Sequence, residues 1–391
     1  MEIDNNVGSK TNQMFLVDNV FETSINRFKY MFDTGEVTIS FSAGKDSGAM
    51  VELALMCRQM YGIKKNINVV LRDEEIMFPG TYEYAERIAK REGVNFYWIV
   101  ANQPIVNIFD RVNPYFWVFD PLAKDKWVRE PYKDTIYIGE LNITEITAKK
   151  RFGYPKDVIM YNCIGIRTSE SMRRKLAIRS SKGYLCKPDS ENVIKSRPIY
   201  DWCDGDIWKF HKDFKLDYNE AYDTMYRLGI PNTKLRIAPP TMSAMGLINL
   251  QGAARAWPRW FDAVCKRLGG VRSAVNFGKR AITPDRRLNE TWQECFYRTC
   301  VNEAPVWIKE RALKMEAWAV TQHNKKSTYP FPHKSNKKGG VNAYFDSYER
   351  LTKIMYAGDP FCIKAPTSVV GYVEPDYFRA DAGKWGGKPS F

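Results

Sequence analysis

The spacing of apolar residues in the first half of the chain alternates between helical and strand periodicity. Apolar side chains recur at helical intervals over residues 12–33, and a short β-branched run follows at residues 37–41. The alternation continues, with helix-like segments at residues 49–60 and 79–92 and strand-like segments at residues 68–71, 95–100 and 158–166. Strands separated by helices in this way predict an α/β fold built on a doubly wound parallel sheet.

The second half of the chain has a different pattern. Beyond about residue 201 the apolar spacing is mainly helical and rich in tryptophan, as far as about residue 320. Residues 323–340 then contain five lysines, two prolines and two glycines with little periodicity, which is typical of a basic loop. The 391 residues also exceed the size of roughly 250–300 at which one core stops growing. We therefore expect two domains, residues 1–240 and a mainly helical C-terminal region of residues 241–391.

The net charge of the chain indicates which classes of partner it can bind. The chain has 59 lysines and arginines against 45 aspartates and glutamates, a formal net charge of +14. This surplus favours polyanionic partners such as nucleotides, DNA or RNA. The basic loop and the aromatic helical tail predict contact with backbone phosphates, while no helix-turn-helix, zinc-finger or RNA-recognition signature indicates base reading. The alternative is a scattered, solvated basic surface whose charge only attracts nucleotides.

The spacing of the cysteines and the hydropathy of the chain exclude several other classes of protein and of metal site. No two of the eight cysteines are separated by just two residues, so zinc ribbons, redox Cys-x-x-Cys pairs and an iron–sulfur cluster are not expected. No apolar run reaches the roughly 18 residues of a membrane-spanning helix. The N-terminus has neither the basic nor the apolar region of a signal peptide. We expect a cytoplasmic chain with free thiols and no membrane partner.

The first strand and the helix after it are joined by a loop of small and polar residues: Ser42, Ala43, Gly44, Lys45, Asp46 and Ser47. Backbone N–H groups at a helix N-terminus attract anions, and glycine lets the backbone approach a phosphate closely. The serine hydroxyls can donate hydrogen bonds, and Lys45 adds a positive charge. The carboxylate of Asp46 suits such a loop if it orients Lys45 or contacts Mg²⁺ beside the phosphates. We expect this loop to bind nucleotide phosphates, with Lys45 and Asp46 as the catalytic residues.

The loop resembles the Ser-x-Gly-Lys-Asp-Ser motif, or PP-loop, of the ATP pyrophosphatase superfamily, the adenine nucleotide alpha hydrolase-like proteins with a Rossmann-like sheet. Further blocks resemble those of phosphoadenosine phosphosulfate (PAPS) reductases. They are Arg72-Asp73 followed by Phe78-Pro79 and Thr81, Gly165-Ile166-Arg167 followed by Ser171 and Arg174, and Lys195-x-x-Pro198 followed by Asp201-Trp202 and Asp206-Ile207-Trp208. Gly80 stands where the family has a glutamate, so this chain lacks that carboxylate.

The resemblance implies a nucleotide site at the carboxyl ends of the parallel strands. Asp73, Gly165 and Arg167 would join the loop around the nucleotide, which would be ATP with Mg²⁺, or PAPS. A second set would surround another phosphate or a sulfate: Ser171, Arg174 and Lys195. The alternatives are a solvated helix face for residues 173–175 and plain core packing for Trp202 and Trp208.

The chain departs from the reductases at its C-terminus. Reductases use a cysteine in a Glu-Cys-Gly-x-His motif, whereas Cys362 has neither Glu nor Gly beside it, and no Cys or His follows it. After Tyr226 the chain reads Arg227-Leu228-Gly229-Ile230-Pro231-Asn232, then Arg236-Ile237-Ala238-Pro239-Pro240 and a helical, Trp-rich tail. This run resembles a phage- and prophage-associated branch that lacks the reductase cysteine. The expected activity is therefore cleavage of the nucleotide between its α- and β-phosphates to adenylylate an acceptor, in nucleic-acid or sulfur-related modification and with a partner protein. The alternatives are thiol-dependent PAPS reduction and a non-catalytic, nucleotide-sensing regulator of phage or prophage gene expression.

Overall fold

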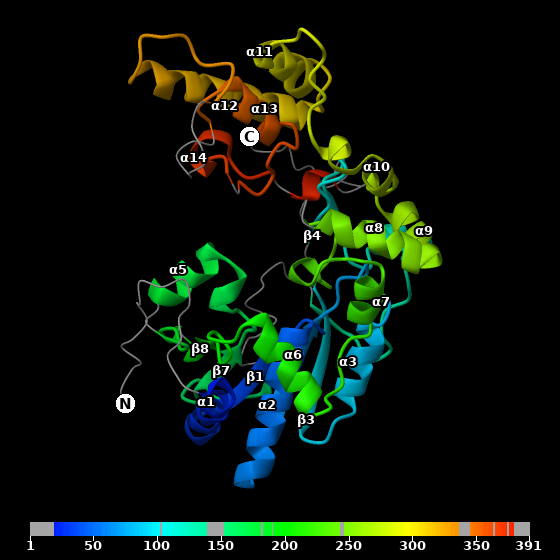
Figure 1. The fold of residues 1–391 in the computed structure, drawn as a ribbon, viewed down its shortest axis with the longest axis vertical. Coiled ribbons are helices and arrows are strands. Elements are labelled where there is room, and N and C mark those ends of the chain that lie inside the picture. Colours follow the sequence, from blue (N-terminus) through cyan, green and yellow to red (C-terminus); the bar gives the residue numbers. More distant parts are fainter. Residues whose placement is uncertain are drawn as a thin grey trace. The chain divides into compact units, whose positions relative to one another are not determined.

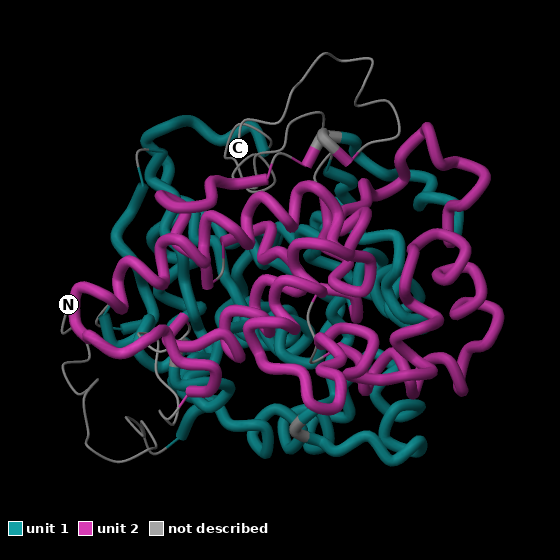
Figure 2. Tube along the Cα trace, turned by 90° about the horizontal axis from the view of Figure 1, so that it is seen from above, with its two compact units in different colours: residues 1–103, 129–239 teal, residues 104–128, 240–391 magenta. Residues whose placement is uncertain are grey.

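The structure is a computed structural model that describes residues 19–101, 104–138, 152–180, 183–189, 191–242, 246–335, 345–362, 364–373 and 375–378. The chain divides into two compact units, coloured separately in Figure 2. Unit 1 comprises residues 1–103 and 129–239, and unit 2 comprises residues 104–128 and 240–391. The expected domains, residues 1–240 and 241–391, stay a prediction, because compact units of one chain are not by themselves independently folding domains.

Unit 1 is built on a six-stranded sheet in the order β6-β3-β2-β1-β7-β8, and every neighbouring pair is parallel (Figure 1). The strands are β1 (Glu36–Phe41), β2 (Ile67–Arg72), β3 (Val94–Ala101), β6 (Ile136–Ile138), β7 (Met160–Cys163) and β8 (Val193–Ser196). The central strands are almost wholly buried, because parallel sheets are covered on both faces. This confirms the predicted Rossmann-like α/β class.

Helices connect and cover the strands of unit 1: α1 (Val20–Thr34), α2 (Lys45–Tyr61), α3 (Thr81–Ala89), α5 (Met172–Ser180), α6 (Asp204–Asp213) and α7 (Ala221–Arg227). Helix α2 packs between α1 and α6, and α1 and α2 both contact β1. Helix α1 begins behind Asn19, whose side chain caps its first turn. The expected helix began at residue 12, and residues 12–18 of that expectation lie outside the described residues.

A buried ion pair attaches α1 to the segment before α6. The guanidinium of Arg27 forms two hydrogen bonds with the carboxylate of Asp201, at 2.8 and 2.7 Å, and both side chains are nearly inaccessible to solvent. Trp202, also buried, donates its indole N–H to the hydroxyl of Ser24. Trp202 is thus part of the core. Plain core packing was the alternative to a binding role for this residue.

Helix α2 begins within the Ser42–Ser47 loop rather than after it. The sequence pattern placed its start at residue 49, whereas Lys45 is already helical and Gly44 is the N-cap. The helix ends at Gly62 with a φ of 62°, a left-handed conformation that glycine adopts without strain. The strand–loop–helix unit therefore points the N-terminus of a 17-residue helix at the carboxyl edge of the sheet.

Unit 2 is mainly helical, as expected. Its helices are α8 (Leu247–Ala256), α9 (Pro258–Arg267), α10 (Val271–Phe277), α11 (Trp292–Phe296), α12 (Val306–Asn324), α13 (Tyr348–Met355) and α14 (Thr367–Val370). A small antiparallel sheet pairs β4 (Pro104–Val106) with β5 (Tyr115–Trp117), so residues 104–128, which follow β3 in the chain, belong to this unit. Among the described residues no helix combines the length and the apolar character needed to cross a bilayer.

Candidate nucleotide site

The Ser42–Ser47 loop has the backbone shape of an anion cradle. Ala43 has a φ of 56°, in the left-handed region that residues with a Cβ rarely occupy. The Ser47 hydroxyl donates to the carbonyl of Gly44 at 3.0 Å and accepts the backbone N–H of Ser42 at 3.2 Å. These bonds fold the loop back on the first turn of α2, whose N–H groups carry the partial positive charge of the helix dipole.

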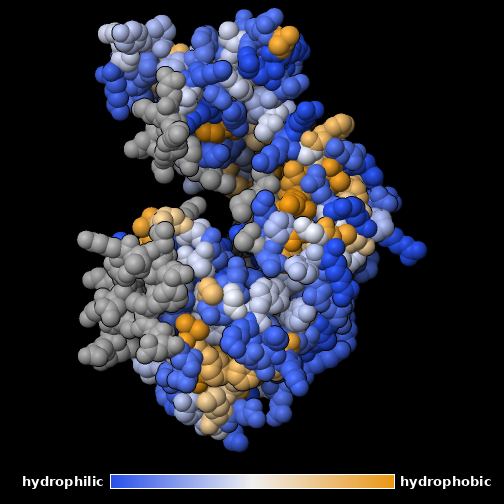
Figure 3. Space-filling view, viewed as in Figure 1, coloured by the Kyte–Doolittle hydropathy of each residue, from blue (hydrophilic) through white to orange (hydrophobic). Residues whose placement is uncertain are grey.

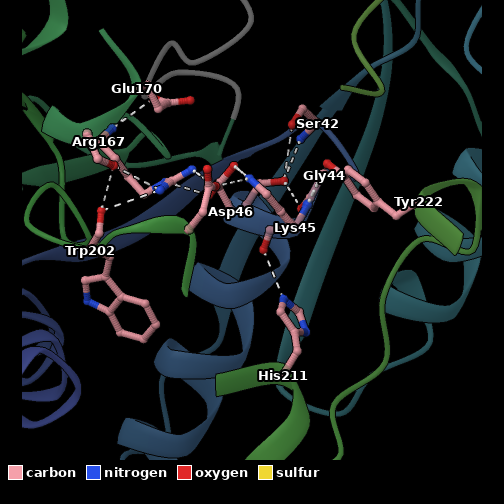
Figure 4. A network of polar contacts seen from close by, with 12 residues as sticks. Ser42, Gly44, Lys45, Asp46, Arg167, Glu170, Trp202, His211 and Tyr222 are labelled. Atoms are coloured by element: carbon pink, nitrogen blue, oxygen red, sulfur yellow. Dashed lines mark hydrogen bonds and ion pairs between the residues drawn. The ribbon is translucent and has the colours of Figure 1, made fainter. Parts of the chain in front are cut away.

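Three side chains from the segment around α6 and α7 support the loop from outside. The hydroxyl of Tyr222 accepts the backbone N–H of Lys45 at 3.2 Å, and Nε2 of His211 lies 3.1 Å from the Lys45 carbonyl (Figure 4). Asn219 donates to the carbonyl of Ala43 at 3.1 Å. Burial lowers the pKa of His211, so the ring is neutral at pH 7, and its Nε2–H can donate to the carbonyl.

Four charged side chains at the start of α2 form a closed network (Figure 4). Lys45 Nζ lies 3.0 Å from a carboxylate oxygen of Asp46 and 3.1 Å from one of Asp204. Arg167 lies 2.7 Å from each of the same two carboxylates. Burial opposes ionisation of Asp204, but Lys45 and Arg167 outweigh it and lower the pKa of its carboxyl. The carboxylate of Asp204 is therefore ionised at pH 7, and the formal charges of the four side chains cancel.

A cavity of about 370 Å³ opens in front of the loop. Its wall includes Ser42, Gly44 and Ser47, and its charged lining consists of Lys45, Asp46, Glu170, Arg174, Asp204 and Arg236. Loop, helix N-terminus and basic side chains thus face one hollow of a size that suits a small ligand. The arrangement can bind a phosphate chain through backbone N–H groups, hydroxyls and cations.

Of the residues expected to join the loop around the nucleotide, Gly165 and Arg167 lie beside it and Asp73 does not. Gly165 lines the cavity, and a Cβ on it would lie 3.3 Å from Cβ of Asp46, so the strand end approaches the loop closely. Arg167 is 1% exposed and directs its guanidinium at Asp46, Asp204 and Ser169. It therefore orients the carboxylates beside Lys45 in this structure.

Asp73 lies elsewhere, below the surface at the end of β2. It is 1% exposed, and its carboxylate accepts the indole N–H of Trp98 at 2.8 Å and the backbone N–H of Glu75 at 2.9 Å. It also forms an ion pair with Arg129, which stacks on the ring of Tyr82. The described lining of the cavity does not include Asp73.

The residues expected around a second anion are separated. Arg174 lines the cavity and is paired with Glu170, which also accepts the backbone N–H of Arg167. Ser171 instead caps the first turn of α5, where its hydroxyl accepts the N–H of Arg174. Lys195 is an exposed residue of β8 and is not part of the described lining.

Cys362, the cysteine on which the reductase alternative depends, belongs to unit 2. Its Sγ donates to the carbonyl of Gly371 at 3.0 Å and accepts from the guanidinium of Arg311 at 3.3 Å. Arg311 is 0% exposed and donates its other hydrogen bonds to backbone carbonyls. The pair binds two chain segments of this unit together.

Sequence reasoning assigned no role to several residues that form the site: Glu170, Asp204, His211, Asn219, Tyr222 and Arg236. Asp204 fell in a variable position of the Asp201–Trp208 block, where the pattern carries no information. Arg236 stands in the run from Arg227 to Pro240 that resembles the phage-associated branch, and that resemblance assigned it no role. Only the approach of segments about 125 to 190 residues from the loop shows their role.

Comparisons with known proteins agree with this geometry. Residues 36–120, from β1 to the segment after β5, match the sequence model of the phosphoadenosine phosphosulfate reductase domain. The uncharacterized protein YbdN of Escherichia coli (strain K12) is 26% identical over 380 residues, 88% of this chain and 89% of that protein. The adenosine 5′-phosphosulfate reductase of Bacillus velezensis is 26% identical over 165 residues, 42% of this chain and 60% of the reductase.

Solved structures align with part of the chain at low identity. The PAPS reductase of Candida auris, in a phosphate complex, aligns with a TM-score of 0.33 and 12% identity, over 54% of this chain and 86% of that one. The FMN adenylyltransferase of Candida glabrata, with FMN and an ATP analogue, aligns with a TM-score of 0.34 and 16% identity, over 53% and 63% of the two chains. The narrower resemblance to a phage-associated branch stays a prediction. Residues 36–120 thus match the phosphoadenosine phosphosulfate reductase domain, and the chain is similar in sequence to adenosine 5′-phosphosulfate reductases.

Proposed function

We propose that unit 1 binds an adenine nucleotide with its phosphates on the Ser42–Ser47 loop and cleaves it between the α- and β-phosphates. The observation that carries the proposal is the cavity in front of that loop, where Lys45 and the N-terminus of α2 face the same hollow. The alternative nucleotide, PAPS, adds a 3′-phosphate to the ribose and carries a sulfate in place of the pyrophosphate of ATP, so it also offers anionic groups to this cavity.

The reaction is nucleotidyl transfer. A lone pair of the acceptor atom attacks the α-phosphorus, the bond from that phosphorus to the bridging oxygen breaks, and pyrophosphate leaves with the bond's electron pair. The acceptor loses its proton to solvent. The loop N–H groups, the Ser47 hydroxyl and Lys45 would hold the β- and γ-phosphates, where charge develops on the leaving group. Asp46 and Arg167 would keep Lys45 in place.

The carboxylates beside the loop fit a magnesium ion. Mg²⁺ is commonly bound through one or two carboxylates together with substrate phosphates and water. Asp46 and Asp204 are such a pair, since both lie within 3.1 Å of the same ammonium group. The described residues offer no cluster of three or more His, Cys, Asp or Glu side chains for a metal, so the phosphates would complete the coordination. Mg²⁺ bound there would neutralise charge on the phosphate chain.

Binding is tested by titration calorimetry with ATP and Mg²⁺. Lys45→Ala and Ser47→Ala should each weaken binding by about tenfold or more, because each removes a direct donor or the bond that shapes the loop. Lys90→Ala is the matched control, since Lys90 is an exposed lysine after α3 that does not line the cavity. Equal affinity in all four proteins would remove the proposed site.

Turnover is tested with radiolabelled ATP or PAPS, with and without DNA, tRNA and thiols. The proposal expects pyrophosphate and an adenylylated acceptor. Release of sulfite from PAPS with thioredoxin, lost in Cys362→Ser, would establish reduction instead. Tight ATP binding with no pyrophosphate under any condition would favour a nucleotide-sensing regulator.

A further inference from the structure

A short extended segment of unit 1 covers the loop and alternates in burial. Leu235 and Ile237 are 7% and 4% exposed, whereas Arg236 and Ala238 between and after them are exposed. All four line the cavity. The end of the Ile237 side chain lies 3.6 Å from where a Cβ on Gly44 would be. The two buried side chains therefore anchor the segment beside the phosphate loop and fix where Arg236 leaves the backbone.

Arg236 differs from the other cations of the cavity in its partners. Lys45 is paired with Asp46 and Asp204, and Arg174 is paired with Glu170. Arg236 forms no hydrogen bond and no ion pair within the described part of the chain. An anion that enters the cavity can thus bind Arg236 without first breaking an ion pair.

The formal charges of the whole lining explain why a cation without an ion-pair partner matters for binding. Three cations and three carboxylates line the cavity among the described residues, so their formal charges cancel. A ligand with several negative charges gains little from such a lining as a whole, and its attraction must come from cations that are not already neutralised. Arg236 is the cation that meets this condition, and its planar fork of donors matches phosphate oxygens.

We infer that Arg236 is a specificity-determining residue that binds the outer phosphates of the nucleotide and selects nucleotides with a polyphosphate chain over nucleoside monophosphates. This inference rests on the proposed function. Lys45 and the loop hold the β- and γ-phosphates from the side of α2. Arg236 reaches the same cavity from the opposing segment and adds a bidentate contact that a monophosphate is too short to use.

The test compares ATP and AMP binding, by calorimetry with Mg²⁺, in wild type, Arg236→Gln and Arg236→Lys. Arg236→Gln should weaken ATP binding about 10- to 100-fold, the usual effect of losing a charge-assisted bond, and change AMP binding less than about threefold. Arg236→Lys should recover part of the ATP affinity, because it keeps the charge and loses the fork. Arg227→Gln is the matched control, an exposed arginine at the end of α7 outside the described lining.

The outcomes separate the two proposals. If wild type binds ATP and the Gln variant keeps the same ratio of ATP to AMP affinity, Arg236 is not the selective residue, while the nucleotide site stands. An equal loss of ATP and AMP binding would also overturn the inference, because Arg236 would then support the site as a whole. If wild type binds neither nucleotide, the proposed function itself is wrong.

Discussion

At the scale of single residues, the main feature of the site is a buried lysine that is already paired with carboxylates. Lys45, the obvious phosphate ligand, is 7% exposed and already lies between two carboxylates. A buried cation without such partners would strongly destabilise the folded state, so the two carboxylates offset the cost of burying the Lys45 side chain. The same carboxylates repel an incoming phosphate. Binding must therefore replace one set of charge contacts by another.

This balance leads to a prediction for Asp204, which is half-exposed and borders the cavity. In Asp204→Asn, without Mg²⁺, ATP should bind about threefold to tenfold more tightly, because one repulsive charge is gone and Lys45 loses a competing partner. The enhancement of ATP binding by Mg²⁺ should fall, since one of two carboxylates that fit the metal is lost. Titrations in EDTA and in Mg²⁺ measure both effects.

Asp213→Asn is the control for that experiment, because Asp213 is on the same helix, paired with Lys209 and distant from the described lining. It should leave both titrations unchanged. If Asp204→Asn weakens ATP binding equally with and without Mg²⁺, Asp204 acts by supporting Arg167 and the loop, and its role as a metal ligand is refuted.

At the scale of elements, the start of α2 is held by contact with α3. A Cβ on Gly48 would lie 2.3 Å from the hydroxyl oxygen of Tyr84, which is 0% exposed and cannot move into solvent. That hydroxyl has no hydrogen-bond partner among the described residues. Glycine in a helix interior usually costs stability relative to alanine, so here it is explained by the space that the tyrosine occupies.

We predict that Gly48→Ala lowers the free energy of unfolding by about 1–3 kcal/mol, as expected for an overpacked core. Tyr84→Phe removes the oxygen that would clash and should be nearly neutral alone. The double variant should recover wild-type stability or exceed it, because alanine has the higher helix propensity. Urea unfolding of the four proteins gives the coupling energy. A double variant as unstable as Gly48→Ala would show that the clash is not with the hydroxyl.

The elements of unit 1 were largely predictable from the sequence, and the site was predictable in part. The strands at residues 37–41, 68–71 and 95–100 appear within one or two residues of their expected bounds, because buried β-branched runs are a strong local signal. The predicted strand at residues 158–166 is shorter, Met160–Cys163. Its last residues turn toward the loop, and this depends on Gly165 fitting beside Asp46.

The sequence did not indicate which side chains the charged residues of the site would contact. Arg167 was expected to bind the nucleotide, and in the structure its guanidinium contacts Asp46 and Asp204. Asp73 was expected to do the same, yet Trp98 and Arg129 occupy its carboxylate. Local patterns indicate where a charge lies along a strand end or a helix. They do not indicate which distant charge neutralises it.

At the scale of the whole molecule, basic charge is distributed over both units. Most of the coloured surface visible in Figure 3 is hydrophilic. Of the lysines expected to contact nucleic acid, Lys325 and Lys326 follow α12 and are exposed, and Lys334 is also exposed. Lys337 and Lys338 lie outside the described residues. Contact of this loop with DNA or RNA therefore stays a prediction.

The prediction is tested by replacing Lys325, Lys326, Lys334, Lys337 and Lys338 with serine. Binding to duplex DNA should weaken, and its logarithmic salt dependence should become shallower by about 0.9 for each phosphate that the loop no longer neutralises. Replacement of the same lysines by arginine keeps the charge and should retain both properties. ATP affinity should be the same in all three proteins. A serine variant that binds DNA and RNA as wild type does at every salt concentration would show that the loop is a solvated linker.

The supports of the phosphate loop determine when the site can exist during protein synthesis. Ala43 and Lys45 depend on His211, Asn219 and Tyr222, which follow them by 166 to 177 residues. A nascent chain that has just completed the matched reductase segment at residue 120 has the loop sequence without these three contacts. The ribosome must add roughly another hundred residues, and they must leave its exit tunnel, before the loop's backbone is held in place. Ligand binding can therefore stabilise the complete unit 1, and it has no supported loop to act on in a nascent chain that ends before these three residues.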